Sequence, residues 1–256
     1  MWEPGNAFDA QAPGSKTDRA VDRLPCGACD DNRHPDLDCR PLMTLPAFTP
    51  FQDLAKALLA HWSGADGDGS HDTSHLQRVW KNAAAIQAKE GGDAEVLFAA
   101  TLLHDCVAVE KDSPLRAQAS RLSAQKARQV LTSLDWPDAR IETVAHAVEA
   151  HSFSAGIAPV TLEAKVLQDA DRLDAIGMVG VARCFYVAGR MGSALYDPAD
   201  PHASERALDD TRFAIDHFHT KLLRLSAGFQ TVTGTRMAIV RRDRLKRFLD
   251  EFAEEI

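Results

Sequence analysis

Cysteine is scarce in this sequence, with five residues among 256. An odd and small number of cysteines does not provide a disulfide framework, so a reducing compartment is expected. The sequence also lacks any apolar run near the roughly 18 residues that a membrane span needs. Its first residues lack the basic start and apolar stretch of a signal peptide. We therefore expect a cytoplasmic protein without a membrane partner.

Positive charge is in the minority, because 29 Lys and Arg residues face 37 Asp and Glu residues, for a net charge of −8. An acidic surface repels the phosphate backbone of DNA and RNA, so nucleic acid is not an expected partner. A nucleotide substrate is compatible with this charge, because a metal ion and a few local cations can reverse the field inside a cleft.

Signals for β-strands are weak as well. Aromatic residues make up 7% of the chain, β-branched residues rarely cluster, and no segment shows sustained alternation of apolar and polar residues. Apolar residues recur instead at helical spacing, which predicts an all-α fold. The segment 162–189 is apolar on nearly all sides, as is typical of a central buried helix. We expect helices over about 51–59, 73–90, 96–107, 119–134, 141–151, 162–189, 205–226 and 232–255.

The N-terminal region differs from the rest in composition. Residues 1–45 are rich in Pro, Gly, Asp and Arg and show no helical period, which predicts a disordered extension before a helical domain over 46–256. The segment Cys26–Cys39 holds three cysteines and one histidine with the spacing of a zinc knuckle, a nucleic-acid-binding module. The intervening residues are acidic and offer no aromatic ring for base stacking, so we favour a disordered tail.

Four ionisable residues in apolar helical surroundings indicate a metal site. His75 lies on the apolar side of its expected helix, His104 and Asp105 end an apolar run, and Asp171 lies in the most apolar segment. Each residue alone is more simply a hydrogen-bonded core side chain or a helix cap. Together they form a costly buried cluster that a metal ion would compensate. Two imidazoles and two carboxylates suit one transition-metal ion such as Mn²⁺, Fe²⁺, Co²⁺, Ni²⁺ or Zn²⁺.

The same residues resemble the HD-domain superfamily of metal-dependent phosphohydrolases, and most closely its YedJ-like bacterial subgroup. The resemblance covers about residues 50–256. It is carried by His71-Asp-x-x-His75-x-x-Arg78-Val79, Leu102-Leu-His-Asp105, Ala150-His-Ser-Phe-Ser154, the string Leu162–Gly177, and His217-Phe-x-x-Lys-Leu-Leu223.

The resemblance implies an HD-domain helical bundle with additional C-terminal helices. It also implies that His75, His104, Asp105 and Asp171 bind one divalent ion, with Mn²⁺ favoured and Mg²⁺ among the alternatives. The implied reaction is hydrolysis of phosphate esters or anhydrides, with nucleotides as the expected substrate class.

Hydrolysis at phosphorus also needs groups that move protons and groups that hold phosphate. Asp72 shares a helical face with His75 and could orient a ligand or take a proton, although a helix cap is an equal alternative. His71 and Glu110 are further candidates for proton transfer. Candidate phosphate-binding residues are Arg78, His151, Lys165, Arg172, His217 and Lys221.

Two acidic residues are candidates for supporting the ligands. Asp174 follows Asp171 by three residues and could hold Arg172 or another group near the ion, and Glu149 is near His151 in sequence. His151 continues the apolar stripe of its helix, so it could also bind a second ion. The fuller His-His pattern of binuclear relatives is not evident, and we favour one metal.

These observations predict a metal-dependent phosphohydrolase that cleaves nucleotides with metal-activated water. It would act as a nucleoside triphosphate pyrophosphohydrolase or as a nucleotide phosphatase. Two alternatives within the superfamily are a phosphodiesterase, which would favour a second metal, and a non-catalytic regulatory module that binds a nucleotide. A third alternative is a nucleic-acid-binding protein that uses the Cys26–Cys39 segment. Nothing in the sequence indicates the oligomeric state.

Overall fold

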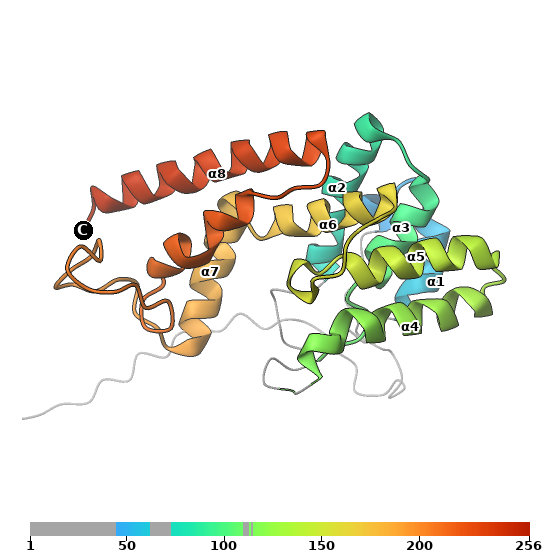
Figure 1. Ribbon diagram of the computed structural model, residues 1–256, viewed down its shortest axis with the longest axis horizontal. Helices are drawn as coiled ribbons and strands as arrows, with labels where there is room; N and C mark the ends of the chain where they lie inside the picture. Colours follow the sequence, from blue (N-terminus) through green and yellow to red (C-terminus); the bar gives the residue numbers. More distant parts are fainter. Residues whose placement is uncertain (1–44, 62–72, 110–112, 114) are drawn as a thin grey trace, which may run out of the picture. The chain divides into compact units, whose positions relative to one another are not determined.

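The computed structural model describes residues 45–61, 73–109, 113 and 115–256. Regular structure within these ranges is helical (Figure 1), apart from an isolated bridge between Ala194 and Phe213. The all-α prediction is confirmed. The expected disordered extension, with its zinc-knuckle spacing, lies outside the described residues except for Leu45. Among the described helices, none is both long enough and apolar enough to cross a membrane.

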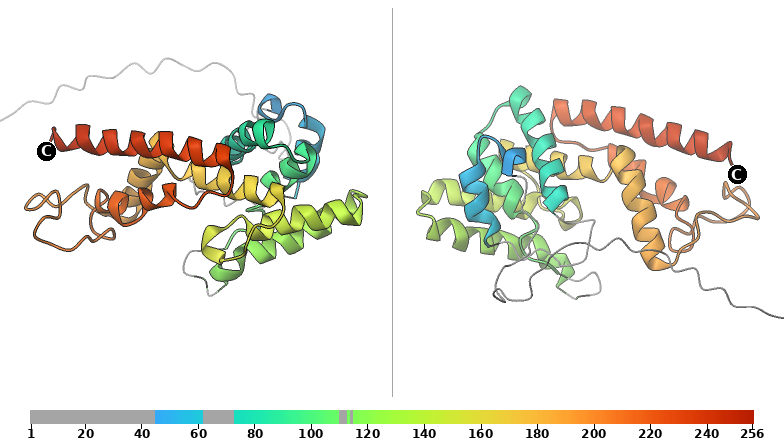
Figure 2. Two further views of the ribbon diagram at one scale, coloured as in Figure 1. Left: turned by 45° about the horizontal axis from the view of Figure 1, so that its top comes forward. Right: turned by 180° about the vertical axis from the view of Figure 1, so that it is seen from behind.

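The helices form a bundle in which α6 is central, in contact with α2, α3 and α5, while α4 pairs with α5. α8 contacts α2, α6 and α7, and it passes across the start of α7, as Figures 1 and 2 show. The α-helices of the described residues are α1 Gln52–Leu59, α2 Thr73–Glu90, α3 Ala94–Leu103, α4 Ala119–Ser133, α5 Asp138–Ala150, α6 Leu162–Asp174, α7 Gly177–Met191 and α8 Val232–Ala253.

The apolar core surrounds α3, in which every residue from Val96 to Leu103 is buried. Asp93 caps the start of this helix, because its carboxylate accepts from the backbone N–H groups of Glu95 and Val96. Each fully buried Leu or Phe contributes about 1.5–3 kcal/mol relative to an exposed one. The residues that end α3 are therefore held at a fixed place in a densely packed interior.

The expected single helix over 162–189 is wrong, because the structure has two helices there. Gly177 takes a φ of +75°, a left-handed conformation that ends α6 and starts α7 in a new direction. A Cβ on Gly180 would overlap the carbonyl oxygen of Ala175, so glycine allows α7 to pass close to the end of α6. α6 is buried as expected, whereas Tyr186 and Met191 of α7 are exposed.

The expected helix over 205–226 is also largely absent. Residues 192–215 form a loop, and the helical residues 216 and 217 lead into a short π-helix, Phe218–Leu222, and a 3₁₀ turn, Arg224–Ser226. Aspartate side chains of the loop take the backbone N–H groups that a helix would use: Asp200 accepts from residues 204–206, and Asp209 from residues 211 and 212. This loop and the π-helix face α7.

Candidate metal centre

Three packed helices bring the four expected metal ligands together. His75 projects from the first turn of α2, His104 and Asp105 follow the last residue of α3, and Asp171 lies in the last turn of α6. Both imidazoles are buried, whereas the side chains of Asp105 and Asp171 are 37% and 28% exposed. The site therefore has a buried imidazole floor and a carboxylate edge that faces solvent.

Hydrogen bonds determine which nitrogen of each histidine faces the site. Nδ1 of His75 donates to Asp174 Oδ2 at 2.9 Å, and Nδ1 of His104 donates to the carbonyl oxygen of Thr101 at 2.7 Å. Both partners can only accept, so Nδ1 carries the proton in each ring. The two Nε2 atoms lie 3.2 Å apart. Asp171 Oδ1 lies 3.6 Å from Nε2 of His75 and 3.9 Å from that of His104.

This arrangement fits a divalent cation. Burial lowers the pKa of His104 to about 4, so its Nε2 presents a lone pair at neutral pH. A lone pair that faces a second imidazole and two carboxylates is unfavourable unless a positive charge lies between them. The donor set of nitrogen and carboxylate oxygen is the type that binds transition-metal ions. Ligand atoms of His75, His104 and Asp171 all lie within 4.8 Å of one another.

His151 contributes to a second donor group with His104 and Asp105. Its Nδ1 donates to the carbonyl oxygen of Val148 at 2.6 Å, and its Nε2 lies 3.5 Å from Asp105 Oδ1. Burial opposes a charge on this ring, but the hydrogen bond and charge of Asp105, with the charge of Asp171, raise the pKa of His151 to about 9. The structure thus places His151 beside Asp105, where its ring is a cation at neutral pH in the absence of a metal ion.

Asp174 supports the site from behind His75. Its buried carboxylate also accepts from Arg78, at 2.7 and 3.1 Å, and from Arg183 at 3.1 Å. Burial alone would raise the pKa of Asp174, but the hydrogen bonds from His75 and Arg78 hold it well below its usual value. The basic partners of Asp174 are therefore Arg78 and Arg183, and not Arg172, which was one of the expected alternatives.

Other expected residues are turned away from the ligands. Arg172 donates to the carbonyl oxygens of residues 225, 227 and 228, and its guanidinium lies between the rings of Phe153 and Phe229. Glu149 pairs with Arg121 at 3.4 Å. Lys165 lies near the start of α6, about 9 Å along the helix axis from Asp171.

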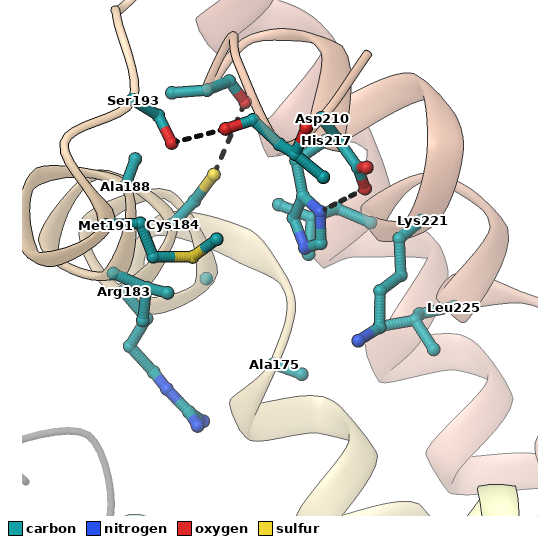
Figure 3. A pocket seen from close by; sticks show the side chains of 15 residues that line it. Ala175, Arg183, Cys184, Ala188, Met191, Ser193, Asp210, His217, Lys221 and Leu225 are labelled. Carbon is teal, nitrogen blue, oxygen red and sulfur yellow. Dashed lines mark hydrogen bonds and ion pairs between the residues drawn. The ribbon is translucent and has the colours of Figure 1, made fainter. Parts of the chain in front are cut away.

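The remaining expected residues divide into two groups. The candidate proton-transfer residues His71, Asp72 and Glu110 lie outside the described residues. His217 and Lys221 line a cavity of about 410 Å³ beside the end of α6, and Arg183 lies on its wall (Figure 3).

Sequence reasoning missed two residues of this region. Arg183 lies on a helix that the sequence did not separate from α6. Asp210 accepts from Nδ1 of His217 at 2.9 Å, across a loop whose course no periodicity reveals. No signal in the sequence indicated Asp210, because residues 205–226 were predicted to form a helix.

The fold and the candidate site are those of a helical domain that could hold a metal ion, and comparisons with known proteins agree. The family model of the HD domain matches residues 73–176, which contain all four candidate ligands. The Bacillus subtilis protein YpgQ, described as uncharacterized, is 32% identical over 195 residues, covering 75% of this chain and 87% of YpgQ. The chain therefore belongs to the HD-domain family, whose domains bind divalent metal ions.

Solved structures extend the likeness beyond the HD segment. A crystal structure of an HD-superfamily hydrolase from Bacillus thuringiensis is similar with a TM-score of 0.60 and 29% identity, covering 80% of this chain and 96% of that one. Bacillus subtilis YpgQ in complex with ADP is similar with a TM-score of 0.61 and 31% identity, covering 78% and 96%. The chain is thus related to HD-superfamily hydrolases over most of its length.

Proposed function

We propose that this protein is a metal-dependent phosphohydrolase of nucleotides, which removes pyrophosphate from a nucleoside triphosphate or phosphate from a nucleotide. The proposal takes residues 46–256 as the phosphohydrolase domain and one divalent ion, preferably Mn²⁺, as its cofactor. The observation that carries it is the convergence of two imidazole Nε2 atoms and two carboxylates from three helices. The complex of YpgQ with ADP supports nucleotides as the substrate class.

The proposed reaction forms a bond from a water oxygen to phosphorus and breaks the bond from phosphorus to the leaving oxygen, which takes up a proton. When bound, the ion would supply polarisation of the phosphoryl group and a lower pKa for water. His75, His104, Asp105 and Asp171 would hold it, with the exposed carboxylates on the substrate side. His151, beside Asp105, is placed to donate to a phosphoryl oxygen. Asp72, His71 and Glu110 are the proposed proton carriers.

A second candidate function is a phosphodiesterase with two ions. The second donor group, formed by His104, Asp105 and His151, favours it, because it could hold an ion beside the first. The number of ions per chain distinguishes the two functions. Metal analysis of the purified protein should give one ion under our proposal and two under this alternative.

The test of the proposed function is a screen for phosphate release from nucleotides and sugar phosphates with Mn²⁺, Mg²⁺, Co²⁺ and Ni²⁺. We expect His104→Ala and Asp105→Ala to lower turnover by on the order of 10²–10³-fold or more, the scale of losing one preorganised electrostatic group. Circular dichroism should show that helical content is retained. Asp250→Ala, on the exposed face of α8, is the control. Unaltered turnover in both site variants would contradict the assignment.

A further inference from the structure

The cavity of about 410 Å³ beside the metal centre has the size of a site for a small organic molecule. α7, the loop before the π-helix, and the π-helix itself form its walls (Figure 3). All but one of its lining residues follow residue 176, where the match to the HD domain ends. The family's metal-binding segment therefore does not account for this cavity.

The cavity is connected to the candidate metal centre through the end of α6. Ala175 lines the cavity and follows Asp171 by four residues, so both lie on the same side of the helix end. Arg183 also lines the cavity, and its Nη1 donates to Asp174, the carboxylate that orients His75. A molecule that extends from the cavity past Ala175 therefore approaches the exposed edge of Asp171.

The two ends of the cavity differ in chemistry. Arg183 and Lys221 lie on either side of Ala175 in Figure 3, so positive charge is concentrated at the end near α6. Met191 and Cys184 lie on the α7 wall, and their polarisable sulfur atoms suit contact with a planar ring.

The opposite wall carries an ordered polar pair. Asp210 Oδ2 accepts from Nδ1 of His217 at 2.9 Å and from Oγ1 of Thr220 at 2.8 Å. These contacts hold both the carboxylate and the imidazole at the cavity, as Figure 3 shows. A partly exposed carboxylate beside an oriented imidazole can form hydrogen bonds with hydroxyl or amino groups of a ligand.

We infer that this cavity binds the nucleoside of the substrate, with its phosphates between Arg183 and Lys221 and its sugar or base hydrogen-bonded to the Asp210–His217 pair. This inference rests on the proposed function and names the part of the site that selects the substrate. The α7 wall receives the ring, and the phosphates extend past Ala175 towards Asp171. Asp210 is thus a specificity residue, whereas Lys221 recognises phosphate whatever is attached to it.

Equilibrium binding tests this assignment without turnover. Calorimetry with Mn²⁺ at fixed concentration compares ADP with inorganic pyrophosphate, which lacks a nucleoside. We expect Asp210→Asn to weaken ADP binding about tenfold, the scale of a lost hydrogen bond to a charged group, and pyrophosphate binding by less than threefold. Lys221→Met should weaken both ligands by a similar factor. Asp250→Asn and Lys246→Met, on the exposed face of α8, are the matched controls.

A third variant covers the case in which Asp210→Asn disturbs the loop. Ala188→Phe places a ring in the cavity from the α7 wall and should weaken ADP at least tenfold more than pyrophosphate. The inference would be overturned if ADP binding were unchanged in both Asp210→Asn and Ala188→Phe, or if these two variants weakened ADP and pyrophosphate binding equally. It would also be overturned if the unmodified protein did not bind ADP. Selective loss of ADP binding would support the inference even if the protein hydrolyses no nucleotide. An absence of nucleotide hydrolysis would contradict the proposed function and not this inference.

Discussion

The carboxylate of Asp174 determines which nitrogen of His75 is free to bind a metal ion. This carboxylate accepts hydrogen bonds from Nδ1 of His75 and from Arg78 and Arg183. Because Nδ1 keeps its proton, Nε2 of His75 has a free lone pair. In Asp174→Asn the amide can turn its NH₂ group towards Nδ1, and the ion pair between Arg78 and residue 174 is lost. We expect the affinity for Mn²⁺ to fall about 10–100-fold. Calorimetric titration of metal-free protein measures this change.

The matched comparison is Asp250→Asn, which removes the same charge from an exposed position on α8. Its Mn²⁺ affinity should equal that of the unmodified protein. If Asp174→Asn binds Mn²⁺ as tightly as this control, orientation of His75 does not depend on Asp174.

The sequence alone could predict the positions of some side chains but not of others. The four candidate ligands were predictable, because short side chains in apolar helical runs have few directions open to them. Arg172 and Glu149 were not, because long side chains reach partners in other elements. The partners of Arg172 lie more than 50 residues further along the chain, in a loop whose position depends on tertiary packing.

The start of α8 depends on one glycine and one buried carboxylate. Asp169 of α6 accepts from the backbone N–H groups of Gln230 and Thr231 and from the Thr231 hydroxyl. A Cβ on Gly234 would overlap this carboxylate and would lie 2.8 Å from Thr231 Oγ1. We expect Gly234→Ala to lower the free energy of unfolding by about 2–3 kcal/mol, from overpacking and a disturbed cap. Urea denaturation measures the loss.

Gly189→Ala is the control for Gly234→Ala, because it makes the same substitution in another helix. Gly189 lies in α7, is exposed, and has open space where a Cβ would be. This substitution should raise stability by about 0.5–1 kcal/mol, because alanine has fewer unfolded conformations and a higher helix propensity. Equal effects of the two substitutions would contradict the role of Gly234 at the α6–α8 contact.

Helices with regular apolar spacing were predictable from the sequence, and α2, α4 and α5 begin and end within a few residues of expectation. The break at Gly177 was not, because apolar residues continue on both sides of it. Residues 205–226 were misassigned for a different reason. Asp200, Asp209 and Asp216 bind backbone N–H groups there, and periodicity does not reveal that competition.

At the scale of the whole molecule, acid should destabilise the fold through buried aspartates. Asp216 is buried and accepts from Arg206 at 2.5 and 3.0 Å and from the backbone of Asp209. Burial alone would raise its pKa, but these hydrogen bonds lower it below the usual value. A carboxylate with a lowered pKa in the folded state stabilises the protein above about pH 3.9, its unfolded value, and this contribution is lost as pH falls towards the folded value.

Asp216→Asn should therefore cost about 2 kcal/mol of unfolding free energy at pH 7, and less as the pH approaches 3. Urea denaturation at pH 7, 5 and 3 follows the difference between the two proteins. Asp250→Asn, exposed on α8, should differ little from the unmodified protein at each pH. A difference for Asp216→Asn that stays constant from pH 7 to pH 3 would show that the ionised carboxylate is not responsible.

The arrangement of the helices was predictable only through the resemblance to HD domains, because periodicity identifies helices but not their neighbours. The match to the HD domain and the likeness to solved structures confirm that resemblance. The cavity could not be predicted, because it depends on the direction that α7 takes after Gly177 and on a loop without a repeating pattern.

Three of the four side chains in the last turn of α6 contact three different parts of the molecule. Asp171 faces the candidate metal centre, Arg172 binds the loop that follows the π-helix, and Asp174 binds His75 and Arg183. Successive residues of a helix point about 100° apart. Inserting or deleting one residue upstream in α6 would therefore place a different side chain in each of these three positions. Insertions and deletions among relatives should therefore lie in loops, and the number of residues in α6 should stay the same.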